Sequence, residues 1–298
     1  MIRLQAPAKL NLYLRVCGKR PDGYHELETL FARIDLADEL TFEPAAAGIA
    51  LTCSEPTLSC GEDNLIVQAA HLLQRVSGTR RGARIRLVKR IPIAAGLGGG
   101  SSDAAATLAG LNALWEVGWE RARLSQLAAE LGADVPFFLC PEPFAIGRGR
   151  GEVCEPICGA QPLTSVLLVP DGRLSTREIF EAADFGLTAP KPSITMVQHA
   201  LCNGSRGELA KGLWNDLAPE AIRRCPVISA IQLQLSQLEC LGIGMSGSGP
   251  SVFGLCRDLT HAQEVIAAML ATVTAACRYV GLVCTTAQGH LCALRSGE

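Results

Sequence analysis

Residues 92–106 read PIAAGLGGGSSDAAA, and this stretch decides how the rest of the chain is interpreted. Its four glycines come directly before Ser101, Ser102 and Asp103, and the alanine-rich residues 104–114 favour a helix after them. Glycine adopts positive φ without strain and lets a ligand approach without meeting a Cβ. The first turn of a helix has unpaired N–H groups and carries the positive end of the helix dipole. Loop and helix together therefore predict a site for an anion, most simply a phosphate, rather than a flexible linker.

Two common phosphate-binding loops are excluded by the residues themselves. A Walker A loop needs Gly-Lys-Ser/Thr, and the chain has no lysine between Lys89 and Lys191. The Rossmann fingerprint G-x-G-x-x-G fails because Ser101 stands where its third glycine would be. What remains is a cradle of backbone amides and hydroxyls. A phosphotransferase built on it must take its cation and its base from elsewhere in the chain.

Length and charge favour a two-domain enzyme of the cytoplasm. A chain of 298 residues exceeds the usual single core. A net charge of -2 provides no electrostatic attraction for nucleic acid or acidic membranes. No charged-then-apolar leader precedes the first strand pattern, and the most apolar stretch, residues 265–277, is too short to span a bilayer. We therefore expect no nucleic-acid or membrane partner, and the sequence carries no signal for an oligomeric state.

The 13 cysteines form no recognisable framework. There is no C-x-x-C pair, and no histidine lies near Cys154 and Cys158, the closest two. This spacing argues against both a zinc site and a disulfide scaffold. We expect free thiols that pack as small buried hydrophobes in a reducing cytoplasm.

Strand and helix patterns alternate irregularly along the chain, which indicates an α+β fold. Residues 6–16 alternate apolar with polar side chains and predict a half-buried strand, followed by a turn at residues 20–23. Asp63 or Asn64 is a candidate cap for a helix that Gly78 ends. The N-terminal domain is expected over residues 1–160 and the C-terminal domain over residues 161–298. Further strands are predicted at residues 36–43, 84–91, 165–170 and 278–285, a strand–loop–strand at 241–255, and helices at 121–131, 176–183, 193–201, 227–238 and 262–276.

Three polar positions each leave two interpretations open. Lys9 is either a solvent-facing strand residue or a compact cation that neutralises developing phosphoryl charge. Asp134, in LGADVPFF, is either a helix N-cap with proline in the first turn or a base for an attacking hydroxyl. Tyr24 and His25 either close a hairpin or stack on and hydrogen-bond a nucleobase.

Three segments taken together resemble a known family. They are PAKLNLYL at residues 7–14, the glycine-rich stretch at residues 92–106 and GMSGSGPSVFG at residues 244–254. This order is similar to that of the GHMP kinase superfamily. RPDGYH at residues 20–25 and GADVPFF at residues 132–138 narrow the resemblance to the kinases that act on a diphosphocytidyl conjugate of methylerythritol in the non-mevalonate isoprenoid pathway.

The resemblance implies an active site in the cleft between the two domains, with ATP and Mg²⁺ as co-substrate and metal. Lys9 and Asp134 correspond to the family's catalytic pair, and Asn11 to a residue that positions the acceptor hydroxyl. Tyr24 and His25 correspond to the cytosine site, as Thr176 and Phe180 do to its second-domain wall. Ser101 or Ser102 could meet a magnesium ion directly or through water, but no obvious carboxylate ligand stands beside them. The ATP loop corresponds to Pro92, Ile93, Ala94, Ala95, Gly96, Leu97, Gly98, Gly99, Gly100, Ser101 and Ser102.

Other functions remain as alternatives at this point. A homoserine or mevalonate type of GHMP kinase would have no nucleobase for Tyr24 and His25 to recognise. A non-catalytic nucleotide-binding regulator would not need both Lys9 and Asp134. A nucleic-acid-binding module needs a basic, aromatic-rich surface that this composition lacks. Gly247 and Gly249 either approach the phosphates or only form a hairpin turn.

Overall fold

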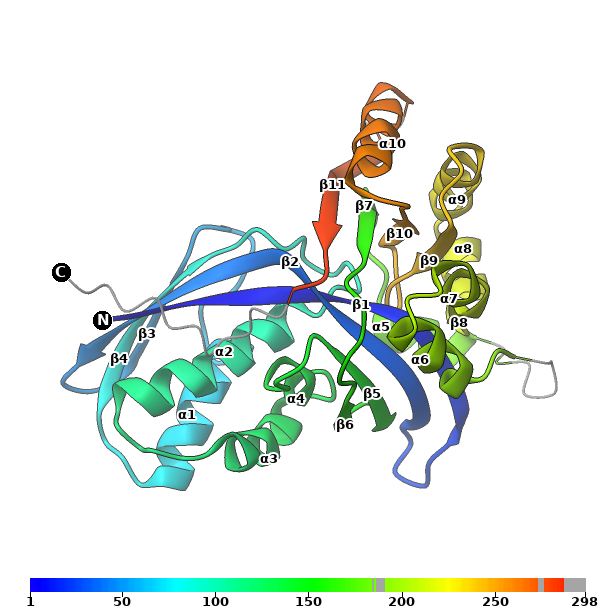
Figure 1. Cartoon of the computed structure of the whole chain (residues 1–298). Coiled ribbons are helices and arrows are strands. Elements are labelled where there is room, and N and C mark those ends of the chain that lie inside the picture. Colours follow the sequence, from blue (N-terminus) through cyan, green and yellow to red (C-terminus); the bar gives the residue numbers. More distant parts are fainter. Residues whose placement is uncertain (184, 186–190, 273–275, 287–298) are drawn as a thin grey trace.

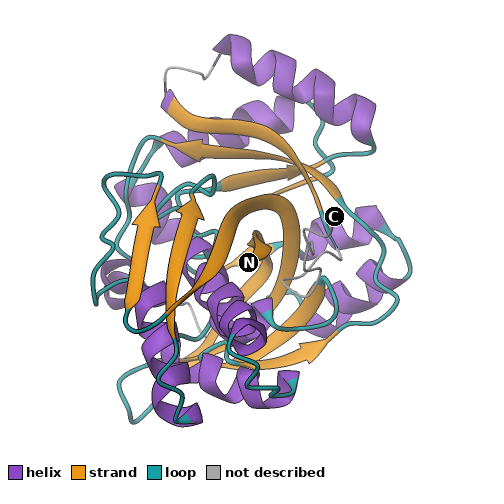
Figure 2. Ribbon diagram, turned by 90° about the vertical axis from the view of Figure 1, so that its left-hand side faces the viewer, coloured by secondary structure: helices purple, strands orange, loops and turns teal. Residues whose placement is uncertain are grey.

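The computed structural model describes residues 1–183, 185, 191–272 and 276–286. The chain forms two sheets with helices packed on them, which confirms the two-domain α+β fold (Figure 1). Figure 2 shows the two groups of strands one above the other, with helices at the top and at the bottom of the view.

The first sheet is built on a long antiparallel hairpin of β1 and β2. Its strands run in the order β3-β4-β2-β1-β8, and β5 pairs with both β2 and β6. β8 comes from the second half of the chain yet pairs in parallel with β1, so the domain boundary after residue 160 stays a prediction. The strands are β1 (Ile2–Lys19), β2 (His25–Ala45), β3 (Ile49–Cys53), β4 (Gly82–Val88), β5 (Phe144–Gly149), β6 (Val153–Pro156) and β8 (Trp214–Asn215).

The second sheet has the order β11-β7-β10-β9, and its neighbouring strands are antiparallel. Its strands are β7 (Thr164–Pro170), β9 (Gly242–Met245), β10 (Val252–Leu255) and β11 (Cys277–Cys284). The helices of the chain are α1 (Leu65–Ser77), α2 (Gly99–Leu114), α3 (Arg121–Leu131), α4 (Val135–Phe138), α5 (Thr176–Ala182), α6 (Ile194–Cys202), α7 (Arg206–Gly212), α8 (Ala218–Arg224), α9 (Val227–Gln237) and α10 (Leu259–Thr272).

Local signals located the helices well. Asn64 caps α1 by accepting a hydrogen bond from the Ile66 N–H at 2.9 Å, and Gly78 ends it with φ +73°. The other predicted helices and strands are present, most of them with ends shifted by a few residues, although residues 273–275 lie outside the described part. The strand predicted at residues 36–43 is the exception, because β2 begins well before it, at His25. Short elements with little periodicity were missed, namely β3, β5, β6, β8, α7 and α8.

The prediction that β1 is half-buried is wrong. Both of its faces are covered, so that Lys9, Asn11 and Tyr13 are as buried as Leu10 and Leu12. Alternation along a strand reports which side chains share a face. It cannot report that the rest of the chain covers the polar face.

The cysteine prediction is confirmed in one part and wrong in another. All cysteines among the described residues are free, but Cys17, Cys60 and Cys158 are exposed and only Cys256 of this set is buried.

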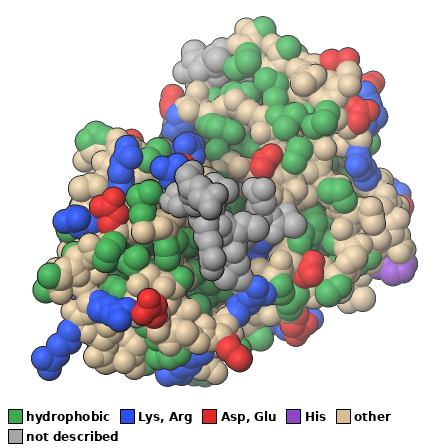
Figure 3. All heavy atoms as spheres, turned by 60° about the vertical axis from the view of Figure 1, so that its left-hand side comes forward, with side chains coloured by type: hydrophobic (Ala, Val, Ile, Leu, Met, Phe, Trp, Pro, Cys, Tyr) green, Lys and Arg blue, Asp and Glu red, His purple; other side chains and the backbone are tan. Residues whose placement is uncertain are grey.

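No described helix is long and apolar enough to cross a membrane. On the face shown in Figure 3, acidic and basic side chains are interspersed.

Candidate active site

A cleft of about 1420 Å³ gathers the predicted site residues from distant parts of the sequence. All of them except Ser102 line it, from Lys9 on β1 to Phe180 on α5. Ser102 is fully buried, and its hydroxyl has no hydrogen-bond partner among the described residues.

The glycine-rich loop needs its glycines for two separate reasons. Gly96 and Gly98 have φ of +75° and +69°, a region that side chains disfavour. A Cβ on Gly98 would lie 2.9 Å from Cζ of Phe138 and 3.1 Å from Cγ of Lys9, so the loop packs directly on the lysine stem. The Lys9 N–H also donates to the Leu97 carbonyl at 2.9 Å. The loop is therefore packed on β1 and hydrogen-bonded to it.

Helix α2 begins at Gly99, before the alanine-rich residues 104–114 over which a helix was predicted. Gly98 is its N-cap and supplies no side-chain hydrogen bond, so Ser101 and Ser102 lie within the first turn rather than at the cap. Because no side chain caps this end, its first-turn N–H groups are open to an anion in the cleft.

Lys9 and Asp134 meet in the cleft. The Lys9 Nζ lies 3.3 Å from Oδ2 of Asp134, and the lysine side chain is 4% exposed against 33% for the aspartate. The solvent-facing interpretation of Lys9 is therefore wrong. Asp134 does occupy the N-cap position of α4, but its side chain makes no capping hydrogen bond. Its carboxylate is left to face the lysine and the cleft.

A chain of hydrogen bonds holds Lys9 in place. Its Nζ donates to Oδ1 of Asn11 at 2.5 Å, and the Asn11 amide donates to Oγ1 of Thr29 at 2.8 Å. The Thr29 hydroxyl donates to the Tyr13 carbonyl at 2.6 Å. Each polar group in this buried chain is paired, so the ammonium has a defined position. Thr29 was not recognised from the sequence because it belongs to none of the motifs.

The third motif, GMSGSGPSVFG at residues 244–254, packs against the glycine-rich loop. The Ser246 hydroxyl donates to the Gly96 carbonyl at 2.9 Å and accepts from the Asn11 N–H at 3.2 Å. Gly247 and Gly249 form the tight loop between β9 and β10, and Gly247 also lines the cleft. A Cβ on Gly247 would lie 3.4 Å from Lys9 Nζ. The two glycines thus form the turn of the β9–β10 hairpin, and whether they also contact phosphates stays a prediction.

Aromatic side chains collect at the other end of the cleft. His25 stacks on Phe180 with ring centroids 5.3 Å apart, and Phe185 meets it edge-on at 5.1 Å. Burial, with a smaller contribution from the positive charge of Lys19, lowers the pKa of His25 below its usual 6.5. The imidazole is therefore neutral at pH 7 and offers one donor and one acceptor. Phe185 belongs to no motif and was missed.

Tyr24 stands at the rim of this aromatic end and is 57% exposed. The Arg150 guanidinium lies 5.2 Å from its ring, within cation–π range. Thr176 is hydrogen-bonded to Ser248 through their hydroxyls at 2.8 Å, which joins α5 to the third motif. These groups form a polar and aromatic surface suited to a planar, hydrogen-bonding ligand.

A buried charge cluster at the base of the loop was also missed. Lys89 Nζ lies 2.6 Å from Asp38 Oδ2 and 2.7 Å from Asp103 Oδ2. Asp38 also accepts from the N–H groups of Arg90 and Ile91, so it fixes the backbone that enters the loop. Burial raises the pKa of Asp103 to about 7, although Lys89 opposes the shift. The cluster joins three segments that no single motif contains.

Both halves of the chain match the domains of one known family. Residues 64–142 match the GHMP kinases N terminal domain, and residues 197–275 match the GHMP kinases C terminal domain.

Full-length relatives agree with this match. A 4-diphosphocytidyl-2-C-methyl-D-erythritol kinase of Pelotomaculum thermopropionicum is 45% identical over 268 residues, which cover 90% of this chain and 93% of that protein. The enzyme of the same name from a Synechococcus species is 44% identical over 293 residues, with 91% and 93% covered.

Solved structures show the same architecture. A crystal structure of 4-(cytidine 5'-diphospho)-2C-methyl-D-erythritol kinase superposes with a TM-score of 0.79 at 38% identity, covering 94% of this chain and 98% of that one. A homoserine kinase of Cytophaga hutchinsonii superposes with a TM-score of 0.74 at 20% identity, covering 96% and 94%, and shares the fold.

Proposed function

Because this chain belongs to the GHMP kinase family, we propose that it transfers the γ-phosphoryl group of ATP to the tertiary hydroxyl of 4-diphosphocytidyl-2-C-methyl-D-erythritol. The observation that carries the proposal is one cleft that holds the Lys9–Asp134 pair beside the glycine-rich loop and an aromatic pocket around His25. The curated relatives and the structural neighbour of that name support the choice of acceptor.

The reaction follows from the geometry of the pair. Asp134 orients the acceptor hydroxyl and takes its proton as the oxygen bonds to the γ-phosphorus and the bond to ADP breaks. Lys9 keeps the carboxylate in place and offsets the negative charge that develops on the transferred group. Asn11 fixes Lys9 on one side and faces the cleft on the other.

The residues present fit a magnesium ion bound together with ATP. Oδ1 of Asp103 is buried without a hydrogen-bond partner in the described chain, and both Asp103 and Ser101 line the cleft. The described residues contain no cluster of three or more His, Cys, Asp or Glu side chains able to hold a metal. Mg²⁺ tolerates this, since it keeps several waters and binds through one or two protein oxygens plus the substrate phosphates. Ser101 and Asp103 would hold the ion, which neutralises charge on the phosphates.

The acceptor end of the cleft separates this function from its alternatives. A neutral His25 stacked on Phe180 can hydrogen-bond and pack against a cytosine, whereas homoserine and mevalonate carry no base. A non-catalytic regulator would not require an aspartate beside a buried lysine. The expectations of a cytoplasmic location and of no nucleic-acid partner stay predictions.

The test is ADP release by the purified protein with the cytidine conjugate, mevalonate and homoserine offered in parallel. Turnover with the cytidine conjugate alone is the expected result. Turnover with another acceptor would overturn the assignment of the aromatic pocket. ATP binding without turnover on any acceptor would favour the regulatory alternative.

A further inference from the structure

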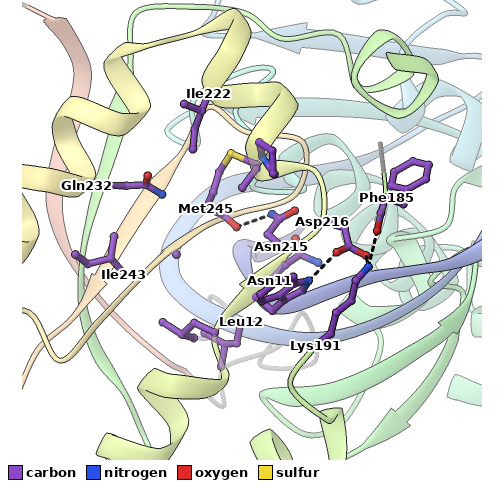
Figure 4. Close-up of a pocket in the computed structure, with 15 residues that line it drawn as sticks. Asn11, Leu12, Phe185, Lys191, Asn215, Asp216, Ile222, Gln232, Ile243 and Met245 are labelled. Carbon is purple, nitrogen blue, oxygen red and sulfur yellow. Dashed lines mark hydrogen bonds and ion pairs between the residues drawn. The ribbon is translucent and has the colours of Figure 1, made fainter. Parts of the chain in front are cut away.

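A second pocket, of about 400 Å³, shares Asn11 with the catalytic cleft (Figure 4). Its polar centre is an ion pair between Lys191 and Asp216, whose Nζ and Oδ2 atoms are 2.7 Å apart with both side chains 3% exposed. A buried ion pair is by itself weak ground for a stabilising role, because desolvation offsets its attraction. The role of the pair therefore depends on the groups to which Lys191 and Asp216 are hydrogen-bonded. The pocket walls include Leu12, Ile222, Ile243 and Met245.

Asp216 is fixed to the central strand. Its Oδ2 accepts from the Val16 N–H at 2.8 Å, its Oδ1 accepts from the Trp214 indole at 2.7 Å, and its own N–H donates to the Leu14 carbonyl at 3.0 Å. The carboxylate is thus immobile, and it provides a firm support for the Lys191 ammonium.

A second hydrogen bond connects Lys191 to the aromatic pocket around His25. Its Nζ donates to the backbone carbonyl of Phe185 at 2.7 Å, as the close-up shows (Figure 4). The ring of Phe185 meets the His25 imidazole edge-on at 5.1 Å, and His25 stacks on Phe180 from another direction. One wall of the aromatic pocket is therefore tied through Lys191 and Asp216 to the same β1 strand that carries the catalytic lysine.

We infer that Lys191 is a positioning residue for the nucleobase, one that sets affinity for the cytidine part of the acceptor without touching it. It does so by holding Phe185 against His25, which keeps the imidazole in the orientation that a cytosine would meet. The inference rests on the proposed function, since it assigns the ligand of the His25 pocket. It leaves the ATP loop and the Lys9–Asp134 pair untouched.

Lys191→Met is the direct test, because methionine keeps the unbranched chain and removes the charge and both hydrogen bonds. Losing the Phe185 anchor should raise the KM for the cytidine conjugate roughly tenfold, the effect of one charge-assisted hydrogen bond. The KM for ATP and kcat should stay within about twofold of wild type. Lys211→Met is the matched control, since Lys211 pairs with Glu208 on the exposed face of α7, and it should change none of these values.

Two further readouts separate positioning from a general loss of structure. Calorimetry with cytidine 5′-diphosphate should show the same roughly tenfold weakening in Lys191→Met, and the proton shifts of the His25 ring should change because the Phe185 ring is no longer held against it. The double variant Lys191→Met/Asp216→Asn removes the uncompensated carboxylate and serves if the single variant does not fold. It should show the same loss of cytidine affinity.

The outcomes distinguish the two proposals. If wild type binds no cytidine 5′-diphosphate, the proposed function fails and this inference fails with it. If wild type binds the nucleotide, but a folded variant without Lys191 binds it equally well and keeps the His25 shifts, only the inference is overturned. Equal loss of ATP affinity and cytidine affinity would also overturn it, since that result indicates a purely structural ion pair.

Discussion

Replacing Gly96 with alanine tests the contact between the phosphate loop and the third motif. Gly96 has φ +75°, and an added Cβ would overlap the Ser246 carbonyl oxygen and lie 3.2 Å from the Gly249 nitrogen. Left-handed backbone costs alanine about 1–2 kcal/mol, and overpacking adds roughly 1–3 kcal/mol because neither backbone segment can give way easily. We expect the free energy of unfolding to fall by about 2–5 kcal/mol and the Tm by roughly 4 °C or more.

Displacement of the loop should also lower the enzyme activity. Moving the loop away from Ser246 misplaces the γ-phosphate relative to Lys9, so kcat/KM for ATP should fall by about 10- to 100-fold. The assays are thermal unfolding and steady-state ADP release, with ATP varied at saturating acceptor.

Gly118→Ala is the matched control. Gly118 has φ +74°, but nothing lies within 4 Å of an added Cβ, so this variant carries the backbone strain without the overlap. It should lose only about 1–2 kcal/mol of stability and keep the wild-type kcat/KM for ATP. Equal losses of stability in the two variants, with equal kcat/KM values for ATP, would refute the role assigned to the contact between Gly96 and Ser246.

Two pH dependences follow from the shifted pKa values of His25 and Asp103. Burial, aided by Lys19, lowers the pKa of His25, so the KM for the cytidine conjugate should be flat near pH 7 and rise only below pH 6.5, as protonation removes the imidazole acceptor. His25→Gln should abolish that rise; an unchanged pH profile in this variant would count against a base-binding role. Burial raises the pKa of Asp103 from 3.8 to about 7, so between these values the folded protein keeps a proton that the unfolded chain has lost, and stability falls as pH rises. Urea unfolding should therefore show Asp103→Asn gaining stability relative to wild type from about pH 4 to pH 7 and levelling off above it, whereas a pH-independent difference would contradict the shift.

Much of the fold could be predicted because its signals are local. Asn64 and Gly78 bracket α1 in the sequence as they do in the structure, since a cap and a left-handed glycine act through their immediate neighbours. The start of α2 was placed too late for a related reason. Serine is the common cap, but here Gly98 takes that position because only a residue without a Cβ fits between Phe138 and the Lys9 stem.

The contacts that define the site are long-range and left little trace in the sequence. Lys9 looked half-exposed because the covering of β1 depends on segments far along the chain. The Lys89 cluster joins Asp38 to Asp103, which lie on β2 and α2, and no periodicity relates them. Phe185 is held by a hydrogen bond from Lys191, and Lys191 is itself paired with Asp216 farther along the chain. Motif resemblance supplied Lys9 and Asp134 as candidates, whereas the structure showed that they meet.

The central claim is that phosphoryl transfer takes place at the Lys9–Asp134 pair, and single-turnover kinetics of Asp134→Asn test it most directly. The substitution removes charge and basicity but little volume, so ATP and the cytidine conjugate should bind as in wild type when checked by calorimetry. With both bound, the rate of product formation should fall by about 10²- to 10⁴-fold, as expected for loss of a general base. A single-turnover rate close to wild type would contradict the account, because the carboxylate beside Lys9 would then play no part in the chemistry.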